Sequence, residues 1–469
     1  MFVVCIDATK HYSQYYYIAI FSKVSFYIKC PMVSAQALTG VGILFNTEGA
    51  MDILVVGGGG REHAIVQLLS RSTEVGKIYC APGNAGIAEL AECVDIAAGN
   101  ISSLVRFVQQ TPGIGLTVVA PDDPLALGLV NELTARGYRA FGPTGEAALI
   151  ESSKVFSKGL MEKYGIPTAK YRSFTDSRQA LAYVRTQEFP LVIKADGLAL
   201  GKGVIICQDL EQAERAVQEI MEDRRFGSAG SSIVVEEFIH GREVSVLAFT
   251  DGESIAVMPS SQDYKRVGDG DTGPNTGGMG TFSPSPLYTD ELHNQCMESI
   301  YLPTVRAMRA EGRTFKGVLY FGLILDEKSG VKVLEYNARF GDPETQVVLP
   351  LLKTDLLSIF NACIDGTLDK LEISWEQASC VCVVMASKGY PGKYRKDDTI
   401  EIQKEDGIMY YHAGTDHNKQ GALVTSGGRV LGVCAKADTV ENARERAYNA
   451  VKGVKFHGAH YRTDIALPR

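Results

Sequence analysis

Two stretches far apart in the sequence carry side chains that suit nucleotide chemistry. Residues 190–203 form an apolar segment that places Lys194 just before a glycine-rich loop, and residues 333–344 contain Glu335 and Asn337. Side chains two positions apart lie on the same face of a strand, so these two oxygen donors are expected side by side. Mg²⁺ usually takes one or two protein oxygens and shares the rest of its shell with phosphates and water. Together the two stretches predict an enzyme that uses ATP.

A first glycine run, at 57–60, follows an apolar segment and precedes a helical pattern, where backbone N–H groups favour a phosphate. A dinucleotide fingerprint is a poor match, because Glu62 stands where its third glycine belongs. No carboxylate ends the second strand either, and the segment 80–86 with Asn84 lies there instead. We interpret both segments as lining the site of a phosphorylated substrate; the alternative is a plain tight turn.

The second glycine-rich loop, at 197–203, is not a Walker A motif, because Gly203 follows Lys202 where a Ser or Thr is required. Strand-like segments flank this loop on both sides, which favours a mobile hairpin loop that closes over a triphosphate. Lys194 would be costly to bury without a partner, and that partner is either a phosphate or a structural carboxylate. The sequence leaves both open. It also leaves open whether Glu236 and Glu237 include a ribose-binding carboxylate or a solvated one.

The predicted order of strands and helices differs from one region of the chain to the next. From Met51 to about residue 151, strands near 52–56, 77–80, 116–120 and 139–141 alternate with helical stretches at 61–70, 102–110 and 124–136. Alternation of this kind predicts right-handed βαβ units and a parallel sheet. A helix at 152–164 follows, with Ser152 or Ser153 as its N-cap.

The central region is a mixture of strands and helices. Strands are expected at 171–174, 191–195, 204–207, 233–237, 317–325 and 331–336, with a hairpin formed by 243–250 and 254–258 and helices at 209–221, 343–352 and 355–365. Residues 262–286 show no periodicity and are predicted to be a functional loop. From about residue 375, strands at 379–386, 399–403, 409–414 and 429–437 and a helix at 440–451 form a small third domain.

Composition narrows the class of protein. The formal net charge is −8 and no long basic run appears, so nucleic-acid binding is not expected. The ten cysteines are scattered without a Cys-x-x-Cys pair, which is typical of a reduced cytoplasmic protein. Residues 1–50 contain no apolar run long enough to cross a bilayer, and we expect them to be an extension outside the fold, with Met51 as the functional start.

Six stretches resemble phosphoribosylamine–glycine ligases, which are ATP-grasp enzymes of purine synthesis. They are the first glycine run with its Arg-Glu-His-Ala continuation, 83–86, 193–203, 263–280, 335–346 and the Gly-Tyr-Pro-Gly around Tyr390, and the resemblance extends to the terminal 461–465. Residues 1–50 have no counterpart in the family pattern. Two positions depart from it: Ala120-Pro-Asp-Asp-Pro replaces Gly-Pro-Glu-x-Pro, and Asp263-Tyr replaces Asp-His.

The resemblance implies an α/β fold with an N-terminal parallel-sheet domain (51–151), a central ATP-grasp domain (152–374) with a mobile subdomain at about 171–245, and a small mixed C-terminal domain (375–469). It implies that glycine is activated by ATP as glycyl phosphate and then captured by the amine of 5-phosphoribosylamine. Catalysis of this kind rests on positioning and electrostatics. Because the acyl phosphate hydrolyses readily, the 197–203 and 262–286 loops are candidates for lids.

The resemblance also assigns candidate residues to roles. Glu335 and Asn337 would hold Mg²⁺ or Mn²⁺. The ATP site would be formed by Lys154, Lys194, Gly201, Lys202, Gly203, Glu236, Phe238 and Glu243. Arg339 and Asp263, with Lys194, would act on glycine and the transferred phosphoryl group. Phosphoribosylamine would contact Gly59, Gly60, Arg61, Asn84, Thr276 and Gly277, with Asp342 and Glu344 on its hydroxyls; helix capping is the alternative role for Asp342.

The prediction is therefore a cytoplasmic, monomeric ATP-dependent carbon–nitrogen ligase whose partners are small molecules. The nearest rival is another ATP-grasp carboxylate–amine ligase that uses bicarbonate or formate. A rival of a different class is a dinucleotide-dependent oxidoreductase built on the first glycine run. A third is a nucleotide-binding module without activity, which the intact pair Glu335 and Asn337 argues against.

Overall fold

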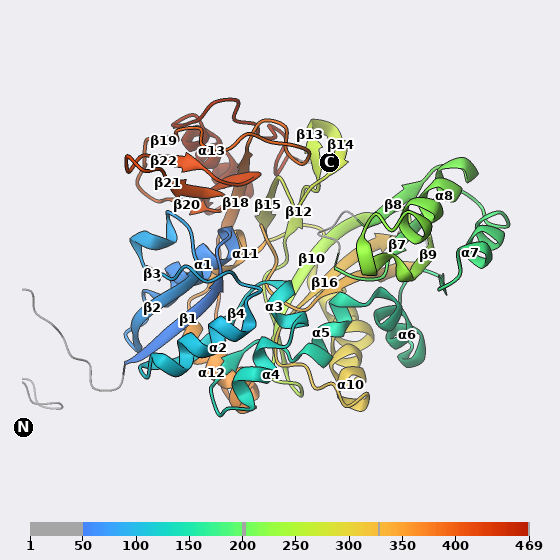
Figure 1. The fold of residues 1–469 in the computed structure, drawn as a ribbon, viewed down its shortest axis with the longest axis horizontal. Coiled ribbons are helices and arrows are strands. Elements are labelled where there is room, and N and C mark those ends of the chain that lie inside the picture. Colours follow the sequence, from blue (N-terminus) through green and yellow to red (C-terminus); the bar gives the residue numbers. More distant parts are fainter. Residues whose placement is uncertain (1–49, 199–202, 327–328, 468–469) are drawn as a thin grey trace, which may run out of the picture. The chain divides into compact units, whose positions relative to one another are not determined.

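A computed structural model describes residues 50–198, 203–326 and 329–467. The segment 1–49 and the predicted ATP-site residues Gly201 and Lys202 lie outside the described residues. The molecule is mixed α/β, with an N-terminal parallel sheet, a central region of two antiparallel sheets and a C-terminal antiparallel sheet, as the predicted α/β class requires (Figure 1). Among the described residues, no helix combines the length and the apolar character needed to cross a bilayer.

The N-terminal sheet has the strand order β3-β2-β1-β4-β5, and every pair in it is parallel. Alternate residues of its central strand enter different cores: Ile53 and Val55 pack with one cluster, Leu54 and Val56 with another. A strand buried on both faces explains the unbroken apolar run. The elements are β1 (Met51–Gly57), α1 (Gly60–Leu69), β2 (Val75–Pro82), β3 (Glu92–Cys93), α2 (Ile101–Gln110), β4 (Ile114–Val119), α3 (Asp122–Ala126), α4 (Leu129–Thr134) and β5 (Ala140–Phe141).

The central region contains two antiparallel four-stranded sheets. The first has the order β11-β10-β16-β17 and the second β6-β9-β7-β8, with an apolar core of its own around Phe174, Ile193 and Ile233. Their strands are β6 (Tyr171–Phe174), β7 (Leu191–Ala195), β8 (Val204–Cys207), β9 (Ile233–Glu237), β10 (Arg242–Thr250), β11 (Ile255–Val257), β16 (Gly317–Asp326) and β17 (Gly330–Asn337). The helices are α5 (Gly145–Ser152), α6 (Lys154–Tyr164), α7 (Ser177–Val184), α8 (Leu210–Val217), α9 (Asp290–Cys296), α10 (Leu302–Ala310), α11 (Thr345–Val348) and α12 (Leu356–Asp365).

The C-terminal sheet has the order β12-β15-β18-β23-β20, so two strands from the segment 262–283 extend it. These elements are β12 (Gln262–Asp263), β15 (Gly280–Ser283), β18 (Ser379–Ala386), β20 (Ile408–His412), β23 (Arg429–Ala437) and α13 (Val440–Val451). Short two-stranded sheets join β13 (Arg266–Gly268) to β14 (Thr272–Asn275), β19 (Glu401–Ile402) to β24 (Val454–Lys455), and β21 (Thr415–His417) to β22 (Leu423–Thr425).

Helix boundaries follow local chemistry. The Ser153 hydroxyl accepts a hydrogen bond from the Phe156 N–H and caps α6, which confirms one of the two predicted caps, and Gly165 ends that helix with a φ of 67°. The single helix predicted at 124–136 is wrong: Gly128 has a φ of 80° and separates α3 from α4. The helix predicted at 343–352 is a single α-helical turn, α11, followed by a 3₁₀ turn at Leu349–Leu351.

The prediction of an irregular loop over 262–286 is also wrong in part. Four strands, β12 to β15, lie within it, each two to four residues long. Strands this short present too few residues for a period of two to be recognised in the sequence. Helices α5, α7, α9 and α10 were not predicted, and neither were the strands of the β21–β22 pair.

Candidate active site

A β-bulge in β17 orients the two predicted metal ligands. Gly322 of β16 pairs with Glu335 and Leu323 pairs with Val333, so Leu334 is an extra residue in the ladder. Up to Val333 the buried residues of β17 have odd numbers, whereas after the bulge Tyr336 is the buried one. Glu335 and Asn337 therefore lie together on the half-buried face. Gly322 makes room for this arrangement, because a Cβ at that position would lie 3.1 Å from Glu335 Cγ. Bulges commonly re-aim side chains beside functional sites.

Four cations surround the Glu335 carboxylate. Burial alone would raise the pKa of Glu335, but Lys265, Lys194, Lys154 and Arg339 together lower that pKa below its ordinary value. The Lys265 ammonium is 3.6 Å from a Glu335 carboxylate oxygen. Asn337 Nδ2 donates to the Tyr336 carbonyl at 3.0 Å, so its amide oxygen is the atom that can face a cation. An ionised carboxylate beside an amide oxygen fits a hard cation such as Mg²⁺.

Lys194 lies in a buried ion-pair network. Its ammonium is 3.0 Å from Glu236 Oε1 and donates to the Leu334 carbonyl at 3.0 Å. Lys158 lies 3.1 Å from the other Glu236 oxygen, and burial lowers the pKa of Lys158 to about 8. The structural carboxylate that the sequence offered as a partner of Lys194 is therefore present. Glu236 contacts two lysines, so the structure places its carboxylate between cations.

The base of the glycine-rich loop is fixed by hydrogen bonds. Lys154 Nζ donates to the Gly197 carbonyl at 3.0 Å, and burial lowers the pKa of Lys154. Asp196 accepts from the Ser153 hydroxyl at 3.0 Å and the Ser232 hydroxyl at 2.8 Å. At the other end of the loop, the Gly203 carbonyl accepts from the Ala195 N–H at 2.8 Å. These contacts place Lys154 beside Lys194 and Glu335.

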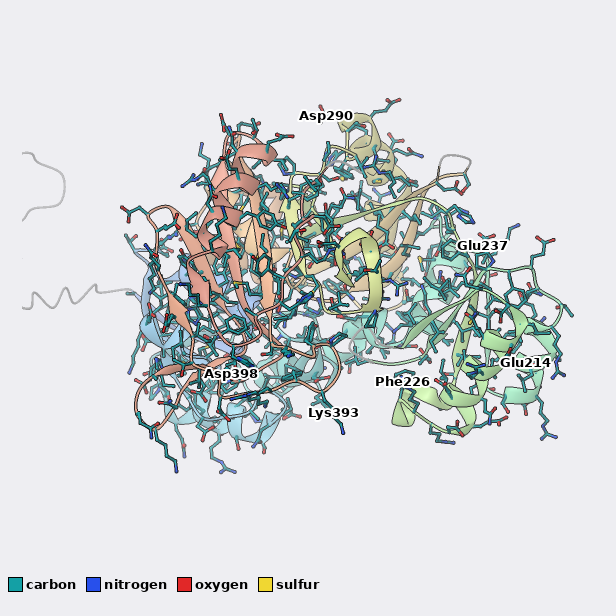
Figure 2. The ribbon with its side chains drawn as sticks, turned by 90° about the horizontal axis from the view of Figure 1, so that it is seen from above. Glu214, Phe226, Glu237, Asp290, Lys393 and Asp398 are labelled. Atoms are coloured by element: carbon teal, nitrogen blue, oxygen red, sulfur yellow. The ribbon has the colours of Figure 1, made fainter. Side chains whose placement is uncertain are left out.

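Residues 237–243 run from the end of β9 into β10 and include three of the residues considered for the ATP site. Phe238 packs edge-on against His240, with ring centroids 4.9 Å apart. Glu243, at the start of β10, lies 3.0 Å from the Lys265 ammonium. Glu237 accepts from the Lys170 N–H at 3.0 Å and lies 3.4 Å from Lys332, so it is paired within the protein. Figure 2 labels Glu237 in the green part of the chain, which also carries Glu214 and Phe226.

A second group of carboxylates gathers around Lys265. Burial raises the pKa of Asp263 to about 8, Lys265 opposes the rise, and Glu344, Glu243 and Glu335 add to it. Glu344 is buried and accepts a hydrogen bond from the Tyr320 hydroxyl at 3.2 Å. The structure therefore brings the predicted residues Asp263, Glu243, Glu335 and Glu344 to one lysine. Sequence reasoning missed Lys265, although it stands two residues after Asp263.

Arg339 is held by a buried carboxylate. Its Nη2 lies 3.0 Å from Glu151, whose other oxygen accepts from the Ala338 N–H at 2.7 Å, and its Nη1 donates to the Phe340 carbonyl at 3.0 Å. Burial lowers the pKa of Arg339, but Glu151, Asp122 and Glu344 outweigh it, so the guanidinium stays charged. The buried Nε has no hydrogen-bond partner among the described residues. A buried donor of this kind is costly unless a ligand satisfies it.

Asp342 pairs with an arginine from the C-terminal sheet. Arg429 Nη2 lies 3.1 Å from Asp342 Oδ2, and Arg429 Nη1 donates to the carbonyls of Gly277 at 2.6 Å and Asp342 at 2.8 Å. Gln346 Nε2 donates to Asp342 Oδ1 at 2.7 Å. No side-chain cap bond is present at the start of α11, so the capping role considered for Asp342 is not what the structure shows.

The predicted substrate residues Thr276 and Gly277 lie next to this pair. The Gly277 N–H donates to the Tyr390 hydroxyl at 3.0 Å. The Thr276 hydroxyl donates to the Lys265 carbonyl at 2.8 Å and accepts from the Gly278 N–H at 3.0 Å. Thr276 therefore ties this segment to Lys265.

The first glycine run is shaped by Glu62. Glu62 Oε2 accepts from the Gly59 N–H at 2.6 Å, and Glu62 Oε1 accepts from Arg61 Nε at 2.6 Å. Arg61 Nη1 donates to the Phe340 carbonyl at 3.1 Å, which connects this run to Asp342 and Arg339. A Cβ at Gly60 would lie 2.6 Å from Gln346 Nε2, so a larger residue there would have to displace the Gln346 side chain, which donates to Asp342. The residue that breaks the dinucleotide fingerprint thus engages the Gly59 N–H.

All four hydrogen-bonding positions of the Asn84 amide are occupied within the protein. Its Nδ2 donates to the carbonyls of Gly58 at 2.9 Å and His412 at 2.8 Å, and its Oδ1 accepts from the N–H groups of Gly86 and Ile87, both at 2.9 Å. The structure therefore gives Asn84 a positioning role between the glycine run and β20.

Sequence reasoning found most of the residues that converge on Glu335 and missed those that hold them. The missed group consists of buried or half-buried residues that act through ion pairs or, for Asp196, through hydrogen bonds: Lys158, Lys265, Glu151, Asp196 and Arg429. Their partners are distant in sequence, so local spacing carries no signal for them. Among the described residues, no three His, Cys, Asp or Glu side chains form a metal site by themselves.

Comparison with known proteins identifies the family. Three domain models of phosphoribosylglycinamide synthetase match in succession: the N domain at residues 51–151, the ATP-grasp (A) domain at 152–345 and the C domain at 380–468. A phosphoribosylamine–glycine ligase of Caldanaerobacter subterraneus is 49% identical over 417 residues, which cover 89% of this chain and 99% of that protein. The chloroplastic enzyme of Arabidopsis thaliana is 48% identical, covering 86% of this chain and 78% of that one.

Solved structures agree. The phosphoribosylamine–glycine ligase of Thermotoga maritima superposes with a TM-score of 0.79 at 32% identity, covering 89% of this chain and all of that chain. The biotin carboxylase of Campylobacter jejuni, at 13% identity and a TM-score of 0.69, shares the fold alone; the alignment covers 87% of this chain and 92% of that one. The chain belongs to the phosphoribosylamine–glycine ligase family, and its central region is an ATP-grasp domain.

Proposed function

We propose that this protein joins glycine to 5-phosphoribosylamine at the expense of ATP, giving glycinamide ribonucleotide, ADP and phosphate, a step of purine biosynthesis. The observation that carries the proposal is the convergence of Lys154, Lys194, Lys265 and Arg339 on the Glu335 carboxylate. An anionic triphosphate and a glycine carboxylate repel each other, and a group of cations offsets that repulsion. Membership of the family supports the choice of substrates.

The reaction proceeds in two displacements. A glycine carboxylate oxygen attacks the γ-phosphorus of ATP, forming glycyl phosphate as the bond to ADP breaks. The amine of phosphoribosylamine then attacks the glycyl carbonyl carbon, phosphate leaves and the amine loses a proton. Little covalent chemistry falls to the protein, so its contribution is to position the reactants and to stabilise charge.

Each group of residues has a place in this scheme. Glu335 and Asn337 would hold the Mg²⁺ or Mn²⁺ ion, which neutralises phosphate charge when bound. Lys154 and Lys194 would neutralise triphosphate charge near the base of the glycine-rich loop. Arg339, with its unpartnered Nε, would receive the glycine carboxylate.

The phosphoribosylamine site is proposed along the first glycine run and Asp342. Arg61 and Arg429 supply positive charge there, next to the Asp342 carboxylate. Other N–H groups of this run would contact the ligand phosphate, whereas the Gly59 N–H is engaged by Glu62. The same contact argues against the oxidoreductase alternative, because the Glu62 side chain occupies the turn that a pyrophosphate would approach.

A substrate panel with ADP release as the readout tests the proposal. We expect ADP only when ATP, a divalent metal, glycine and phosphoribosylamine are all present, apart from a slow background with glycine alone. Bicarbonate or formate in place of glycine tests the rival ATP-grasp ligases. Rapid ADP release with either of these and none with glycine would overturn the substrate assignment. The proposal also includes a monomeric state and a cytoplasmic location, which light scattering and cell fractionation test.

A further inference from the structure

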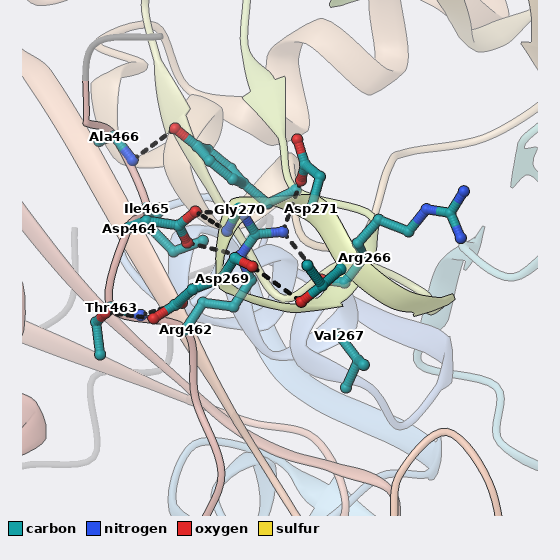
Figure 3. Close-up of polar contacts among 12 residues, drawn as sticks. Arg266, Val267, Asp269, Gly270, Asp271, Arg462, Thr463, Asp464, Ile465 and Ala466 are labelled. Atoms are coloured by element: carbon teal, nitrogen blue, oxygen red, sulfur yellow. Dashed lines mark hydrogen bonds and ion pairs between the residues drawn. The ribbon is translucent and has the colours of Figure 1, made fainter.

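The C-terminal segment 460–466 is hydrogen-bonded to the β13–β14 hairpin (Figure 3). Its Arg462 side chain is fully buried, with 0% exposure. Arg462 Nη1 donates to the Arg266 carbonyl at 3.0 Å and to Asp271 Oδ1 at 2.8 Å. The other edge of the guanidinium is bound bidentately by Asp464, at 2.7 and 2.6 Å. One arginine therefore joins the first residue of β13 and the turn before β14 to the C-terminal segment.

Further contacts run along the same segment. The Asp464 carboxylate also accepts from the Gly270 N–H at 2.9 Å, and Asp269 accepts from the Thr463 N–H at 2.8 Å. His460 Nε2 lies 2.8 Å from the Val267 carbonyl oxygen. Figure 3 shows Asp269, Gly270 and Asp271 facing Arg462, Thr463 and Asp464 across these bonds. The hairpin is thus bonded to residues nearly two hundred positions later in the chain.

The β13–β14 hairpin has few internal contacts that could keep it ordered. Its two strands are three and four residues long, and residues 269–274 are exposed. An isolated two-stranded hairpin is at best marginally stable in water. A buried guanidinium is costly unless it is paired, and here pairing uses donors on Nε, Nη1 and Nη2. Arg462 therefore supplies two of the hydrogen bonds that hold the hairpin against the C-terminal segment.

The same segment contacts the residues on both sides of Lys265, at the Arg266 backbone and the Tyr264 side chain. On one side, Arg462 binds the Arg266 carbonyl. On the other, the Arg462 guanidinium lies 4.8 Å from the centroid of the buried Tyr264 ring, and the Ala466 N–H donates to the Tyr264 hydroxyl at 2.8 Å. Lys265 stands between these two anchored residues, and its ammonium points to Glu243 and Glu335 in the active site.

We infer that Arg462 is a positioning residue for the reaction, which holds Lys265 in place through the Arg266 carbonyl and the Tyr264 ring. The inference rests on the proposed function for its kinetic test and on the geometry alone for its structural test. Lysine cannot replace this arginine, because an ammonium lacks the planar fork that bonds Asp464 on one edge and the hairpin on the other.

Hydrogen exchange provides the structural test. In Arg462→Lys we expect faster exchange over 264–279, including the Thr276 amide that bonds to the Lys265 carbonyl at 2.7 Å, and unchanged protection in β16 and β17. Arg446→Lys is the matched control, because Arg446 bonds to the carbonyls of Lys436 and Gly407 within the C-terminal region and contacts no residue of the hairpin in the described structure. Unchanged exchange over 264–279 in Arg462→Lys would overturn the inference.

A double-mutant cycle provides the kinetic test. We expect Arg462→Lys to lower kcat about tenfold with little change in KM for ATP, since small misplacements of a reacting group cost this much or more. In a Lys265→Met background the same substitution should change kcat less than twofold, because the residue it positions is gone. A general loss of folded enzyme would instead lower kcat equally in both backgrounds, and that result would refute the positioning role.

Failure of the Arg462 inference can be distinguished from misfolding of the variant and from failure of the proposed function. If Arg462→Lys does not fold, Asp271→Asn takes its place, since it removes the charge facing Arg462 while asparagine tolerates the positive φ of 55°. If the wild-type protein shows no ligase activity, the proposed function fails, but the exchange measurement still decides whether Arg462 orders the hairpin. If the wild type is active and Arg462→Lys keeps full kcat, only the inference fails.

Discussion

At the scale of residues, the site is a set of charges whose placement matters more than their number. Glu335 is kept ionised by four cations, whereas burial keeps Asp263 protonated near neutral pH, with a pKa of about 8. Two carboxylates near the same lysine therefore have different tasks: one is suited to a metal, the other to donating a hydrogen bond or a proton. Burial and charge, which no motif encodes, produce this difference.

Glu335→Gln tests the metal role. The amide keeps the shape of the side chain but removes the charge that a divalent cation needs, so kcat/KM should fall at least about 100-fold. The thermal unfolding midpoint should fall slightly, because the ionised carboxylate is stabilised in the folded protein by Lys265, Lys194, Lys154 and Arg339. Steady-state kinetics at saturating Mg²⁺ and Mn²⁺ measure the effect. Near wild-type turnover would show that another group binds the metal.

Lys158→Met tests whether the buried pair network supports Lys194. Removal of one cation leaves Glu236 with a single partner, and breaking one side of a buried pair typically costs about 3–5 kcal/mol. We expect a clear fall in the unfolding midpoint. The exposed Lys163→Met, in the same helix, is the control, since its exposed pair with Glu311 should contribute below about 1 kcal/mol. Equal midpoints for the two variants would contradict the network.

At the scale of elements, alternation and capping predict where β1, β10, β16, β17 and α13 lie, because each is long enough to show its period. The sequence is a poorer guide to the pairing register of a strand, and so to which of its faces is buried. The two-residue spacing of Glu335 and Asn337 correctly places them on one face, yet the bulge at Leu334 decides that this face is not the one buried with Val333. Short strands and capped turns such as β12–β15 carry too little pattern to be predicted.

Gly322→Ala tests the importance of this local geometry. The added methyl group would lie 3.1 Å from Glu335 Cγ, so the carboxylate must move by a few tenths of an ångström. We expect kcat to fall about 3- to 10-fold with stability nearly unchanged. Gly159→Ala, in α6 with nothing within 4 Å of the new methyl group, should leave kcat unaltered. The bulge would be unimportant for activity if both variants matched the wild type.

At the scale of the whole molecule, the active site depends on contacts between segments that are far apart in the chain. The N-terminal helix α1 meets β20 through His63, whose Nδ1 accepts from the His412 N–H at 2.9 Å. Asp342 meets Arg429, and the C-terminal segment meets the β13–β14 hairpin. None of these pairings is visible in local spacing, so the sequence predicts the regions but not how they join.

The His63–His412 contact predicts a stability that depends on pH. Burial lowers the pKa of His63 to about 3, with His412 and Lys404 adding to the effect. Burial also lowers the pKa of His412 to about 4. Both rings are neutral when folded, whereas the unfolded chain takes up protons below about pH 6.5, so stability is full above that pH and falls as the pH decreases towards 4.

Each histidine should contribute a loss of about 1.5 kcal/mol between pH 6.5 and 5. Thermal unfolding midpoints across this range measure it. In His63→Gln the amide oxygen can accept from the His412 N–H without titrating, so the dependence on pH should be weaker than in the wild type. A His63→Gln profile parallel to that of the wild type would assign the acid sensitivity to other groups.

A crystal structure with Mn²⁺ and a non-hydrolysable ATP analogue would show directly whether Glu335 and Asn337 hold the metal. Anomalous scattering locates the metal without reference to any assumed ligand. We expect a peak next to the Glu335 carboxylate, the Asn337 oxygen and the phosphates, with Lys154 and Lys194 against the same phosphates. A nucleotide bound with its metal away from Glu335 and Asn337 would contradict it.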